Sequence, residues 1–563
     1  MDGSSDGAMS DYWCRSTAAI LTALLLSIPS PAADWPQWGR DASRNAVSPE
    51  KNPPINFELP HREDGKPNNP GRNIAWQADL GDRTYVPPVI ADGFVWVSTN
   101  ARDPNDDTNR IPEKDWDGGV LMCFRESDGK LLWKHRSPRL SSPADGPGEL
   151  DYEDRWRSPI GCAPWVEGDR LWLVNNRSEV VCWDIAPLKK GIGEPHQVWT
   201  LDMRKKFKVF PRTDPCTNGT PGFGTSVGGY KDWLYVVTRN SADPGQSPDI
   251  SPLEKLARWN GLSDREIKSP VPAPEAPSLL CLEKTTGKLV WQDNSPGKGI
   301  LEYQLSSPLV VEVKGKPQVI VAQGDGWLRS FGAATGKLIW KCDLNWKDSM
   351  WQGASRDDRN YVVATPVMWN GRIYVPTGRD VLQFTGSATL FCIDPTKTGD
   401  ISLEVDDGPK KGKANPNSAV VWHTPRKVPD DAPRVEVGTN NKKKDLLRSR
   451  DFFFCRTVAN VTIHDGLLYA VDVVGMVYCI DANTGKLYWV DDLHTTALGQ
   501  PLWVDGKVIV TTSDGAFIYA HGKERKLLKK LETDERLDAG AVFANDTLFV
   551  QGSSTLFAIR KPK

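Results

Sequence analysis

Short runs in which apolar and polar residues alternate, separated by turns rich in Gly, Asp and Asn, continue along most of the chain. The stretch LYAVDVVGMVYCIDANTGKLYWVDDL, from Leu468 to Leu493, contains three such runs and a Thr-Gly-Lys turn. Alternation with a period of two, bounded by such turns, predicts β-strands joined by hairpins. The pattern therefore predicts an all-β protein.

The alternating runs belong to a repeated unit. One ending occurs four times, as SDGKLLW (Ser127–Trp133), TTGKLVW (Thr285–Trp291), ATGKLIW (Ala334–Trp340) and NTGKLYW (Asn483–Trp489). Three shorter runs precede each ending, so each unit predicts four strands. We count eight units, whose first strands are expected to begin near Pro88, Pro159, Ser226, Pro308, Pro366, Asn460, Pro501 and Ala541. Four-stranded sheets repeated around an axis make a β-propeller.

The last unit stops before its fourth strand, and the segment Asn73–Leu80, which contains Trp76, has the missing pattern. Pairing the two chain ends would close the ring and leave no bare sheet edge. The predicted fold is thus a single eight-bladed propeller over residues 73–563, preceded by an N-terminal extension over residues 34–72. Two units depart from the pattern. The seventh lacks the tryptophan, and in the fifth the tryptophan would be Trp422, which an insertion separates from the preceding strands.

The Gly-Lys-x-x-Trp endings resemble those of the PQQ-like repeat proteins, whose eight-bladed propellers include quinoprotein dehydrogenases and the BamB-type outer-membrane assembly factor. The segment DWPQWGRDASRNAVSP, residues Asp34–Pro49, is similar to the one that opens many quinoprotein dehydrogenases. In that family the repeated tryptophans dock between neighbouring blades. The resemblance implies this role for Trp76, Trp133, Trp199, Trp291, Trp340 and Trp489.

Cysteines occupy one position of the repeat. Cys123, Cys281 and Cys479 each lie ten residues before the repeated tryptophan, Ser330 takes the same place in the fourth unit, and Cys182 and Cys392 hold the matching strand position. Equivalent positions in separate blades are too far apart for a disulfide, so a small buried side chain is the expected role. The pairing of Cys162, Cys216, Cys342 and Cys455 stays open.

Residues 1–33 predict an export signal. Arg15 precedes the apolar run Thr17–Ile28, and Ser30 and Ala32 supply small residues for processing after Ala32. The run is too short to cross a bilayer, and no other apolar stretch is long enough. We therefore expect an exported protein, periplasmic or secreted, without a membrane span. The net charge of −2 gives no reason to expect a nucleic-acid partner.

The long connections fall in two classes, which share one face of a propeller. They are Thr99–Gly119 and Asn240–Pro277 between second and third strands, and Arg136–Arg157, Asp202–Gly224, Asp343–Val363 and the stretch around Asp406–Arg450 between blades. Long loops on a rigid scaffold usually carry binding or catalysis. The loop lengths therefore predict one face that carries the function, with Ile185–Gln197 as the exception on the other face.

Polar residues that close the second strands should surround the axial funnel on this face. The candidates are Asn100, Asn175, Arg177, Arg239, Asn240, Asp325, Arg379, Asp380, Asp472 and Asp514, with Trp327 as a platform for a flat cofactor. Arg and Asn could hold a carboxylated ligand, and Asp a divalent ion. The alternative is ordinary turn chemistry, which also favours Asn and Asp.

Two hypotheses of function follow. The first is a non-catalytic binding or assembly scaffold, with a protein partner or a small molecule at the loop-bearing face. The second, implied by the resemblance, is a dehydrogenase that uses PQQ and calcium to oxidise a small alcohol, aldehyde or sugar. Quinoprotein alcohol dehydrogenases carry two adjacent cysteines, and this sequence has no Cys-Cys pair; it also has no Cys-x-x-Cys-His motif for haem. We favour the scaffold and assign no catalytic residue or metal ligand.

Overall fold

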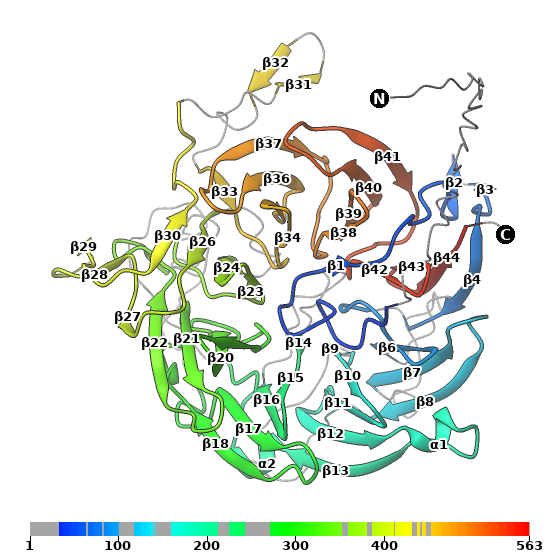
Figure 1. Cartoon of the computed structure of the whole chain (residues 1–563), viewed down its shortest axis with the longest axis horizontal. Helices are drawn as coiled ribbons and strands as arrows, with labels where there is room; N and C mark the ends of the chain where they lie inside the picture. The colour runs from blue at the N-terminus through cyan, green and yellow to red at the C-terminus, as the bar shows by residue number, and fades with distance from the viewer. Residues whose placement is uncertain are drawn as a thin grey trace, which may run out of the picture. The chain divides into compact units, whose positions relative to one another are not determined.

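Eight four-stranded antiparallel sheets stand in a ring, which confirms the predicted eight-bladed β-propeller (Figure 1). Ala32–Lys563 form one compact unit. The computed structural model describes residues 33–561 except 64–65, 82–83, 101–117, 139, 141–158, 212–224, 243–270, 352–357, 380–385, 410, 431–435, 440–441 and 446–451.

The first four blades follow one another along the chain. Blade 1 contains β5 (Val89–Ala91), β6 (Phe94–Asn100), β7 (Gly119–Arg125) and β8 (Leu131–Ser137), and blade 2 contains β10 (Trp165–Glu167), β11 (Arg170–Val174), β12 (Glu179–Asp184) and β13 (His196–Asp202). Blade 3 contains β15 (Gly228–Tyr230), β16 (Trp233–Val237), β17 (Leu279–Glu283) and β18 (Leu289–Asp293). Blade 4 contains β19 (Leu309–Val313), β20 (Lys316–Ala322), β21 (Trp327–Gly332) and β22 (Leu338–Asp343).

The other four blades complete the ring. Blade 5 contains β23 (Val367–Trp369), β24 (Arg372–Pro376), β26 (Leu390–Ile393) and β30 (Val420–His423), and blade 6 contains β34 (Thr462–His464), β35 (Leu467–Val471), β36 (Met476–Asp481) and β37 (Leu487–Asp492). Blade 7 contains β38 (Leu502–Val504), β39 (Lys507–Thr512), β40 (Gly515–Ala520) and β41 (Leu527–Glu532). Blade 8 contains β42 (Ala541–Ala544), β43 (Thr547–Gln551), β44 (Thr555–Ile559) and β4 (Ile74–Asp79).

The ring closes by pairing of the chain ends, as predicted. Strand β4 runs antiparallel to β44, with Trp76 opposite Ala558. Two further short strands extend blades: β1 (Val47–Ser48) pairs parallel with β38, and β27 (Gly399–Asp400) pairs parallel with β22. Within the described residues no helix is long and apolar enough to span a membrane; the two α-helices are α1 (Ala186–Lys189) and α2 (Met203–Phe207).

The antiparallel order gives the ring two different ends. The turns between first and second strands and between third and fourth strands lie at one end, called here the short-hairpin end. The connections between second and third strands and between blades lie at the other, the loop-bearing end.

Our expectation that the stretch around Asp406–Arg450 joins two blades is wrong for its first part. Strand β30 is the fourth strand of blade 5, so residues 394–419, with the hairpin β28 (Glu404–Asp406) and β29 (Gly412–Ala414), join its third and fourth strands. This insertion therefore belongs to the short-hairpin end. The repeated Gly-Lys-x-x-Trp ending, which marks the fourth strand in blades 1, 3, 4 and 6, is absent here, and Trp422 nevertheless pairs with Cys392.

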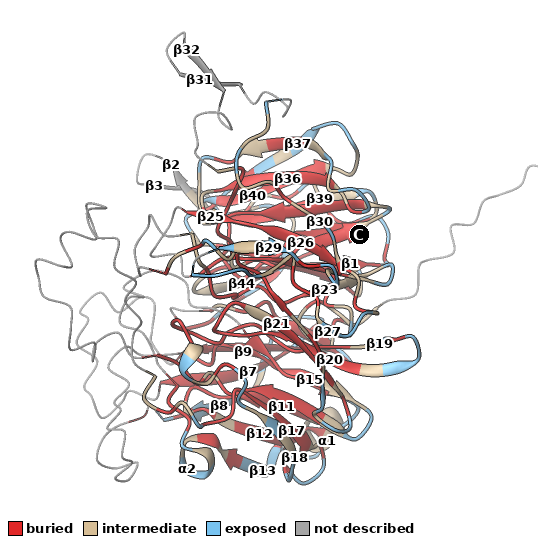
Figure 2. Ribbon diagram, turned by 90° about the vertical axis from the view of Figure 1, so that its left-hand side faces the viewer, coloured by how far each residue is buried: buried red, intermediate tan, exposed pale blue. Residues whose placement is uncertain are grey.

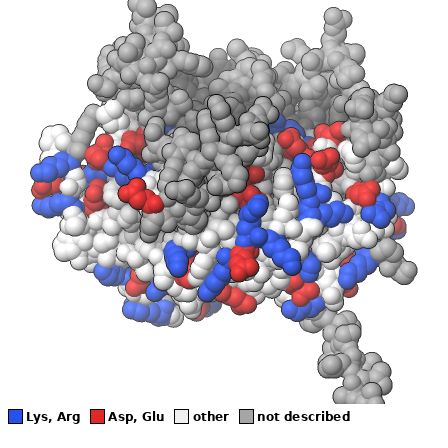
Figure 3. Space-filling view, turned by 90° about the horizontal axis from the view of Figure 1, so that it is seen from above, with Lys and Arg blue, Asp and Glu red and all other residues white. Residues whose placement is uncertain are grey.

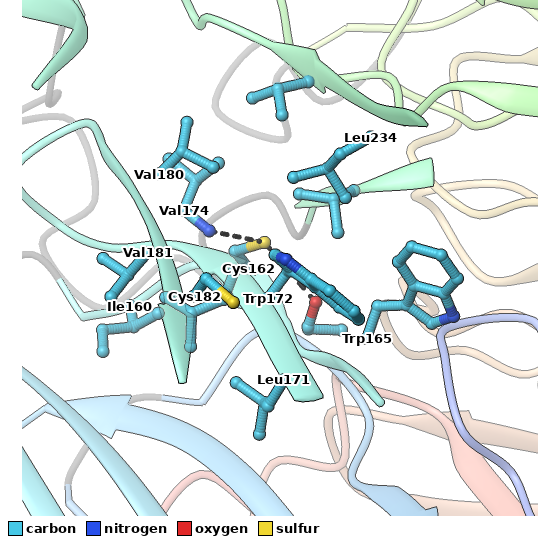
Figure 4. Close-up of a cluster of buried hydrophobic side chains, with 14 of the residues drawn as sticks. Ile160, Cys162, Trp165, Leu171, Trp172, Val174, Val180, Val181, Cys182 and Leu234 are labelled. Carbon is cyan, nitrogen blue, oxygen red and sulfur yellow. Dashed lines mark hydrogen bonds between the residues drawn. The ribbon is translucent and has the colours of Figure 1, made fainter. Parts of the chain in front are cut away.

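The cysteine position lies between two aromatic side chains on neighbouring strands. The rows are Trp96–Cys123–Trp133, Trp172–Cys182–Trp199, Tyr235–Cys281–Trp291, Tyr374–Cys392–Trp422 and Tyr469–Cys479–Trp489. In four rows the flanking rings approach to 5.9–6.2 Å between centroids across the small residue. Figure 4 shows Cys182 beside Trp172 in the buried core of blade 2. A larger side chain would push the rings apart, which explains why the position is small.

All eight cysteines within the described residues are buried free thiols, including Cys162, Cys342 and Cys455. Burial raises the pKa of Cys281 and of Cys479 to about 12, so neither forms a thiolate at neutral pH. Because the thiolate is the reactive form, we expect a thiol reagent at pH 8 to modify at most the remaining two of the ten cysteines in folded protein. Denaturation should release all ten thiols of the full 563-residue chain, or nine in a chain that begins at Ala33 and so lacks Cys14. Three or more reactive thiols in the folded state would contradict the structure.

The tryptophan of the outermost strand binds the next blade. Its indole Nε1 donates to a backbone carbonyl there: Trp76 to Glu126 (2.9 Å), Trp199 to Lys284 (2.9 Å), Trp291 to Ala333 (2.8 Å), Trp422 to Ala482 (2.8 Å) and Trp489 to Gly522 (3.1 Å). Two tryptophans differ. Trp340 donates to Gln318 of its own blade (3.3 Å), and Trp133 packs edge-on against Trp183 of blade 2, with centroids 5.1 Å apart.

The glycine of the Thr-Gly-Lys turn lies against the tryptophan of the preceding blade. A Cβ added to Gly129, Gly287, Gly336 or Gly485 would lie 2.5–2.8 Å from that ring, and each has a positive φ. The turn therefore requires glycine for its backbone conformation and for the ring beside it. Figure 2 shows the result of this packing, blades that are buried along most of their length.

Candidate functional site

The segment before the propeller crosses the short-hairpin end of the ring. We call residues 33–50 the N-terminal plug; Figure 1 shows its dark blue trace in the middle of the ring. Its hydrogen bonds reach all eight blades, at Ile90, Val166, Val227, Pro308, Met368, Ile463, Trp503 and Asn545. The plug therefore ties the inner strands together.

Arg44 is the centre of the plug. Its guanidinium, 2% exposed, donates to the carbonyls of Trp38 (2.9 Å), Val227 (2.7 Å) and Pro308 (3.1 Å). Burial lowers the pKa of Arg44 to about 10, so it is protonated at neutral pH. The charge is thus held by backbone carbonyls of the plug and of blades 3 and 4.

A belt of buried polar groups surrounds this arginine. The backbone N–H of Ser226 donates to Ser307 Oγ (2.8 Å), that of Ser307 to Thr365 Oγ1 (3.0 Å), and that of Thr365 to Asn460 Oδ1 (2.6 Å). Asn460 continues to Gln500 (3.4 Å), Gln500 donates to Arg44 O (2.9 Å), and Arg44 Nη1 reaches Ser226 Oγ (3.4 Å). The pairs Ser307-Pro308 and Thr365-Pro366, at the starts of two first strands, therefore supply acceptors to the preceding blade, a role that the sequence did not reveal.

The three described aspartates among the funnel candidates do not converge. Asp325 forms a bidentate ion pair with Arg329 of its own blade (3.0 and 2.6 Å). Asp472 accepts from Tyr478 Oη (2.8 Å) and from two backbone N–H groups of its own turn. Asp514 is exposed on blade 7. Asp325 is thus held by Arg329 of its own blade, and Asp472 accepts three hydrogen bonds from residues of its own blade.

The other candidates are also spread around the ring. Asn240, fully buried, bonds Phe210 N and Ala273 O, and Arg379 is buried over the ring of Trp351 (4.5 Å). Asn100 is buried and Arg239 half-buried, at the ends of the second strands of blades 1 and 3, and Asp380 lies outside the described residues. Trp327 lies within 4.8–5.6 Å of the cations of Arg329, Lys341 and Lys347.

These residues do not fit a PQQ and calcium site. Calcium prefers several oxygen ligands around one point, and no group of three or more His, Cys, Asp or Glu in the described part of the chain could hold a metal ion. The face of Trp327 that a flat cofactor would need lies among three cationic side chains. Whether any funnel candidate binds a ligand stays a prediction.

Two of the candidates, Asn175 and Arg177, line a cavity between blades 1 and 2 with a volume of about 450 Å³. It opens at the loop-bearing end, because Ser137 ends β8 and Asn175 follows β11. The lining residues are Leu121, His135, Arg136, Ser137, Pro138, Ile160, Leu173, Asn175, Arg177, Glu179, Val181, Trp183 and Gln197.

The cavity combines an apolar wall with polar groups. His135 stacks on Trp133 (6.0 Å) and meets Trp183 edge-on (4.6 Å), and burial lowers its pKa, so the imidazole is neutral at pH 7. Arg177 contacts Glu179 (3.3 Å), which also accepts from Asn175 (2.8 Å). The Ser137 hydroxyl, 2% exposed, has no hydrogen-bond partner among the described residues.

The described residues on the side drawn in Figure 3 show no field of one sign. On the side drawn in Figure 3, the described Lys and Arg side chains are interspersed with Asp and Glu. Such a surface gives no footprint for a polyanion.

Comparison with known proteins places the chain. Residues 275–423 and 412–562 match the family model described as outer membrane protein assembly factor BamB, and together they span just over half of the chain. No curated protein matches the sequence.

Solved structures with similar coordinates share little sequence. BamB from Moraxella catarrhalis is 11% identical, with 86% of this chain and 96% of that chain covered and a TM-score of 0.46. Quinohemoprotein alcohol dehydrogenase from Comamonas testosteroni is 13% identical, with 94% and 81% covered and a TM-score of 0.41. A europium-containing methanol dehydrogenase is also 13% identical, with 92% and 89% covered and a TM-score of 0.42. From the family match, the chain belongs to the PQQ-like repeat family that the BamB model describes.

Proposed function

We propose that this protein is an exported, non-catalytic binding scaffold that engages a protein partner at its loop-bearing end. The observation that carries the proposal is the cavity between blades 1 and 2, which opens at that end. A pocket with an apolar wall and a few convergent polar groups is the usual form of a binding site. Its size suits a large side chain or a short segment of a partner.

The chemistry of the lining indicates what enters. The lining contains Arg136, Arg177 and one carboxylate, that of Glu179, which Arg177 contacts, so the formal charge of the lining residues is positive. The hydroxyl of Ser137 offers a hydrogen bond that no described residue uses. We infer that the cavity receives an acidic or carboxyl-terminal group with an adjoining apolar part.

Two further points support a scaffold over a dehydrogenase. Asp325 and Asp472, two of the candidate ligands for calcium, are engaged inside their own blades. The matching family model is named for an outer membrane protein assembly factor. The predicted export signal over residues 1–33 would bring the chain to the compartment outside the cytoplasm.

A photo-crosslinking residue at Pro138 tests the cavity in cells. Pro138 lines the cavity, follows β8 at the loop-bearing end and is exposed. We expect one discrete protein adduct, identified by mass spectrometry, whose yield falls at least about tenfold when Ser137→Leu fills the cavity, since every 1.4 kcal/mol of lost affinity is tenfold. Ser137→Ala, which removes only the hydroxyl, should have a smaller effect. The same probe at Lys316, exposed near the short-hairpin end of blade 4, is the control.

Equal adducts at Pro138 and Lys316, or an adduct that Ser137→Leu leaves unchanged, would contradict binding in the cavity. Calorimetric titration of the folded protein with PQQ, with and without calcium, tests the other hypothesis. We expect no binding. Tight, calcium-dependent binding would instead support a quinoprotein dehydrogenase.

A further inference from the structure

Three carboxylates meet where the two ends of the N-terminal plug lie together. Asp34 and Glu50 come from the plug, and Glu126 follows the third strand of blade 1. All three gather around the blade 8 hairpin residue Asn545. Its side-chain nitrogen donates to Asp34 (2.9 Å) and to Glu126 (3.1 Å), and its backbone N–H donates to Glu50 (2.7 Å).

No cation pairs with these carboxylates among the described residues. Glu50 is 1% and Glu126 7% exposed, and neither forms an ion pair there; the same holds for Asp34. The guanidinium of Arg560 donates to the backbone carbonyls of Glu126 and Ser127 (both 2.7 Å), and its charge acts on the Glu126 carboxylate from there. The backbone N–H of Asp92 donates to Asp34, and the carboxylate of Asp92 accepts from Lys189 Nζ (2.8 Å).

The crowding is costly for the charged forms. Burial raises the pKa of Glu126 to about 7; the charges of Asp34 and Glu50 add to the rise, and the hydrogen bond from Asn545 and the charge of Arg560 oppose it. Buried charges in proteins are normally paired, because an unpaired ion out of water is expensive. Among the described residues, the cluster therefore has no cation in direct contact with its carboxylates.

One backbone nitrogen lies beside the carboxylates, at a place where a positive charge would pair with them. The nitrogen of Ala33 lies 2.8 Å from Glu50 Oε1, as a peptide N–H in the continuous chain. We propose that the chain is hydrolysed between Ala32 and Ala33, and that the new α-ammonium of Ala33 is the counter-ion which fixes the plug to the propeller.

The reaction is the ordinary hydrolysis of a peptide by an export-processing peptidase, with water as the second reactant. The C–N bond between the two residues breaks, the hydroxyl of water joins the carbonyl carbon as the carboxylate of Ala32, and the nitrogen of Ala33 gains protons to become an ammonium. The inference rests on the export proposed above. It adds that processing completes the fold of the plug, because the ammonium converts a hydrogen bond with one charged partner into an ion pair.

The amino terminus of the exported chain gives the first test. The full chain is produced in an exporting bacterium, and the mature protein is analysed by mass spectrometry of its N-terminal peptide. We expect the mature chain to begin at Ala33. A mature chain that begins at any other residue would overturn the proposal.

Hydrogen exchange of the plug tests the ion pair without export. Two chains are released from a fusion partner without extra residues, one that begins at Ala33 and one that begins at Pro31; both retain residues 33–563 of the compact unit. We expect amides of residues 35–48 to exchange at least about tenfold more slowly in the first, since local opening governs exchange. Acetylation of the α-amino group of Ala33 should abolish the difference.

Variants separate charge from packing. Glu50→Gln should make the two chains exchange alike, whereas Glu524→Gln, an exposed position elsewhere, should keep the tenfold difference. Equal exchange in the unaltered chains, or no effect of acetylation, would overturn the role of the ammonium. Because this comparison needs no export, its failure is distinguishable from failure of the chain to leave the cytoplasm, which would overturn the proposed function.

Discussion

Replacing Trp76 by alanine is expected to lower the free energy of unfolding by about 3–5 kcal/mol, the usual cost of removing a buried tryptophan. Trp76 is 8% exposed, lies on the strand that closes the ring, and donates to Glu126 O of blade 1 (2.9 Å). Its ring also contacts Phe549, with centroids 5.9 Å apart. The loss therefore weakens both the closure of blade 8 and its docking to blade 1, and denaturant unfolding measures it.

A double-mutant cycle isolates the docking contact. A Cβ on Gly129 would lie 2.5 Å from the Trp76 ring, so Gly129→Ala should be strongly destabilising in the unaltered protein. In the Trp76→Ala background the clash is gone, and only the cost of a positive φ, about 1 kcal/mol, should remain. Ile192→Ala, at a position 77% exposed, is the control and should change stability by less than about 0.5 kcal/mol. An equal cost of Gly129→Ala in both backgrounds would contradict the docking.

The blades could be predicted because their signals are local. Alternation of apolar and polar residues with a period of two predicts each strand. The Thr-Gly-Lys turn and the tryptophan after it indicate where the third strand ends and the fourth strand lies within one unit. The same locality explains the error in blade 5. There an insertion separates β26 from β30, so no turn of fixed length connects Cys392 to Trp422, although the two still pair across the sheet.

The funnel candidates were chosen by their place at the ends of second strands, and that rule does not determine where a side chain points. Asp325 bonds Arg329, four residues away, and Asp472 bonds Tyr478, six residues away. These are contacts inside one hairpin, in keeping with the turn chemistry that the sequence left open as the alternative. The cavity contains Asn175 and Arg177 because blades 1 and 2 face each other there, and a single repeat does not contain that information.

The N-terminal plug depends on contacts between residues far apart in the chain, which sequence patterns do not predict. The segment Asp34–Pro49 is recognisable by resemblance, but its role depends on partners far along the chain. Arg44 bonds Val227 and Pro308, 183 and 264 residues away, and Asn45 bonds Ile463, 418 residues away. Such contacts arise only after the ring has formed, so alternation and turns do not predict them.

Replacing Arg44 by methionine is expected to cost about 2–5 kcal/mol, because the carbonyls of Trp38, Val227 and Pro308 lose their donor while they stay buried. Arg44→Lys keeps the charge but cannot match the fork of the guanidinium, so it should recover only part of the stability. Denaturant unfolding measures the loss, and limited proteolysis within residues 33–50 should be faster in both variants, since the plug is then held less firmly.

Arg40 provides the matched control within the same segment. It pairs only with Asp41 among the described charged groups (2.6 Å), at a site where both side chains are partly exposed, so Arg40→Met should cost less than about 1 kcal/mol. If Arg40→Met and Arg44→Met destabilised the protein equally, the belt would not depend on a cation at the axis. A larger loss at Arg44, with cleavage confined to the plug, would show that one buried guanidinium joins the inner strands of the propeller to the segment that precedes it.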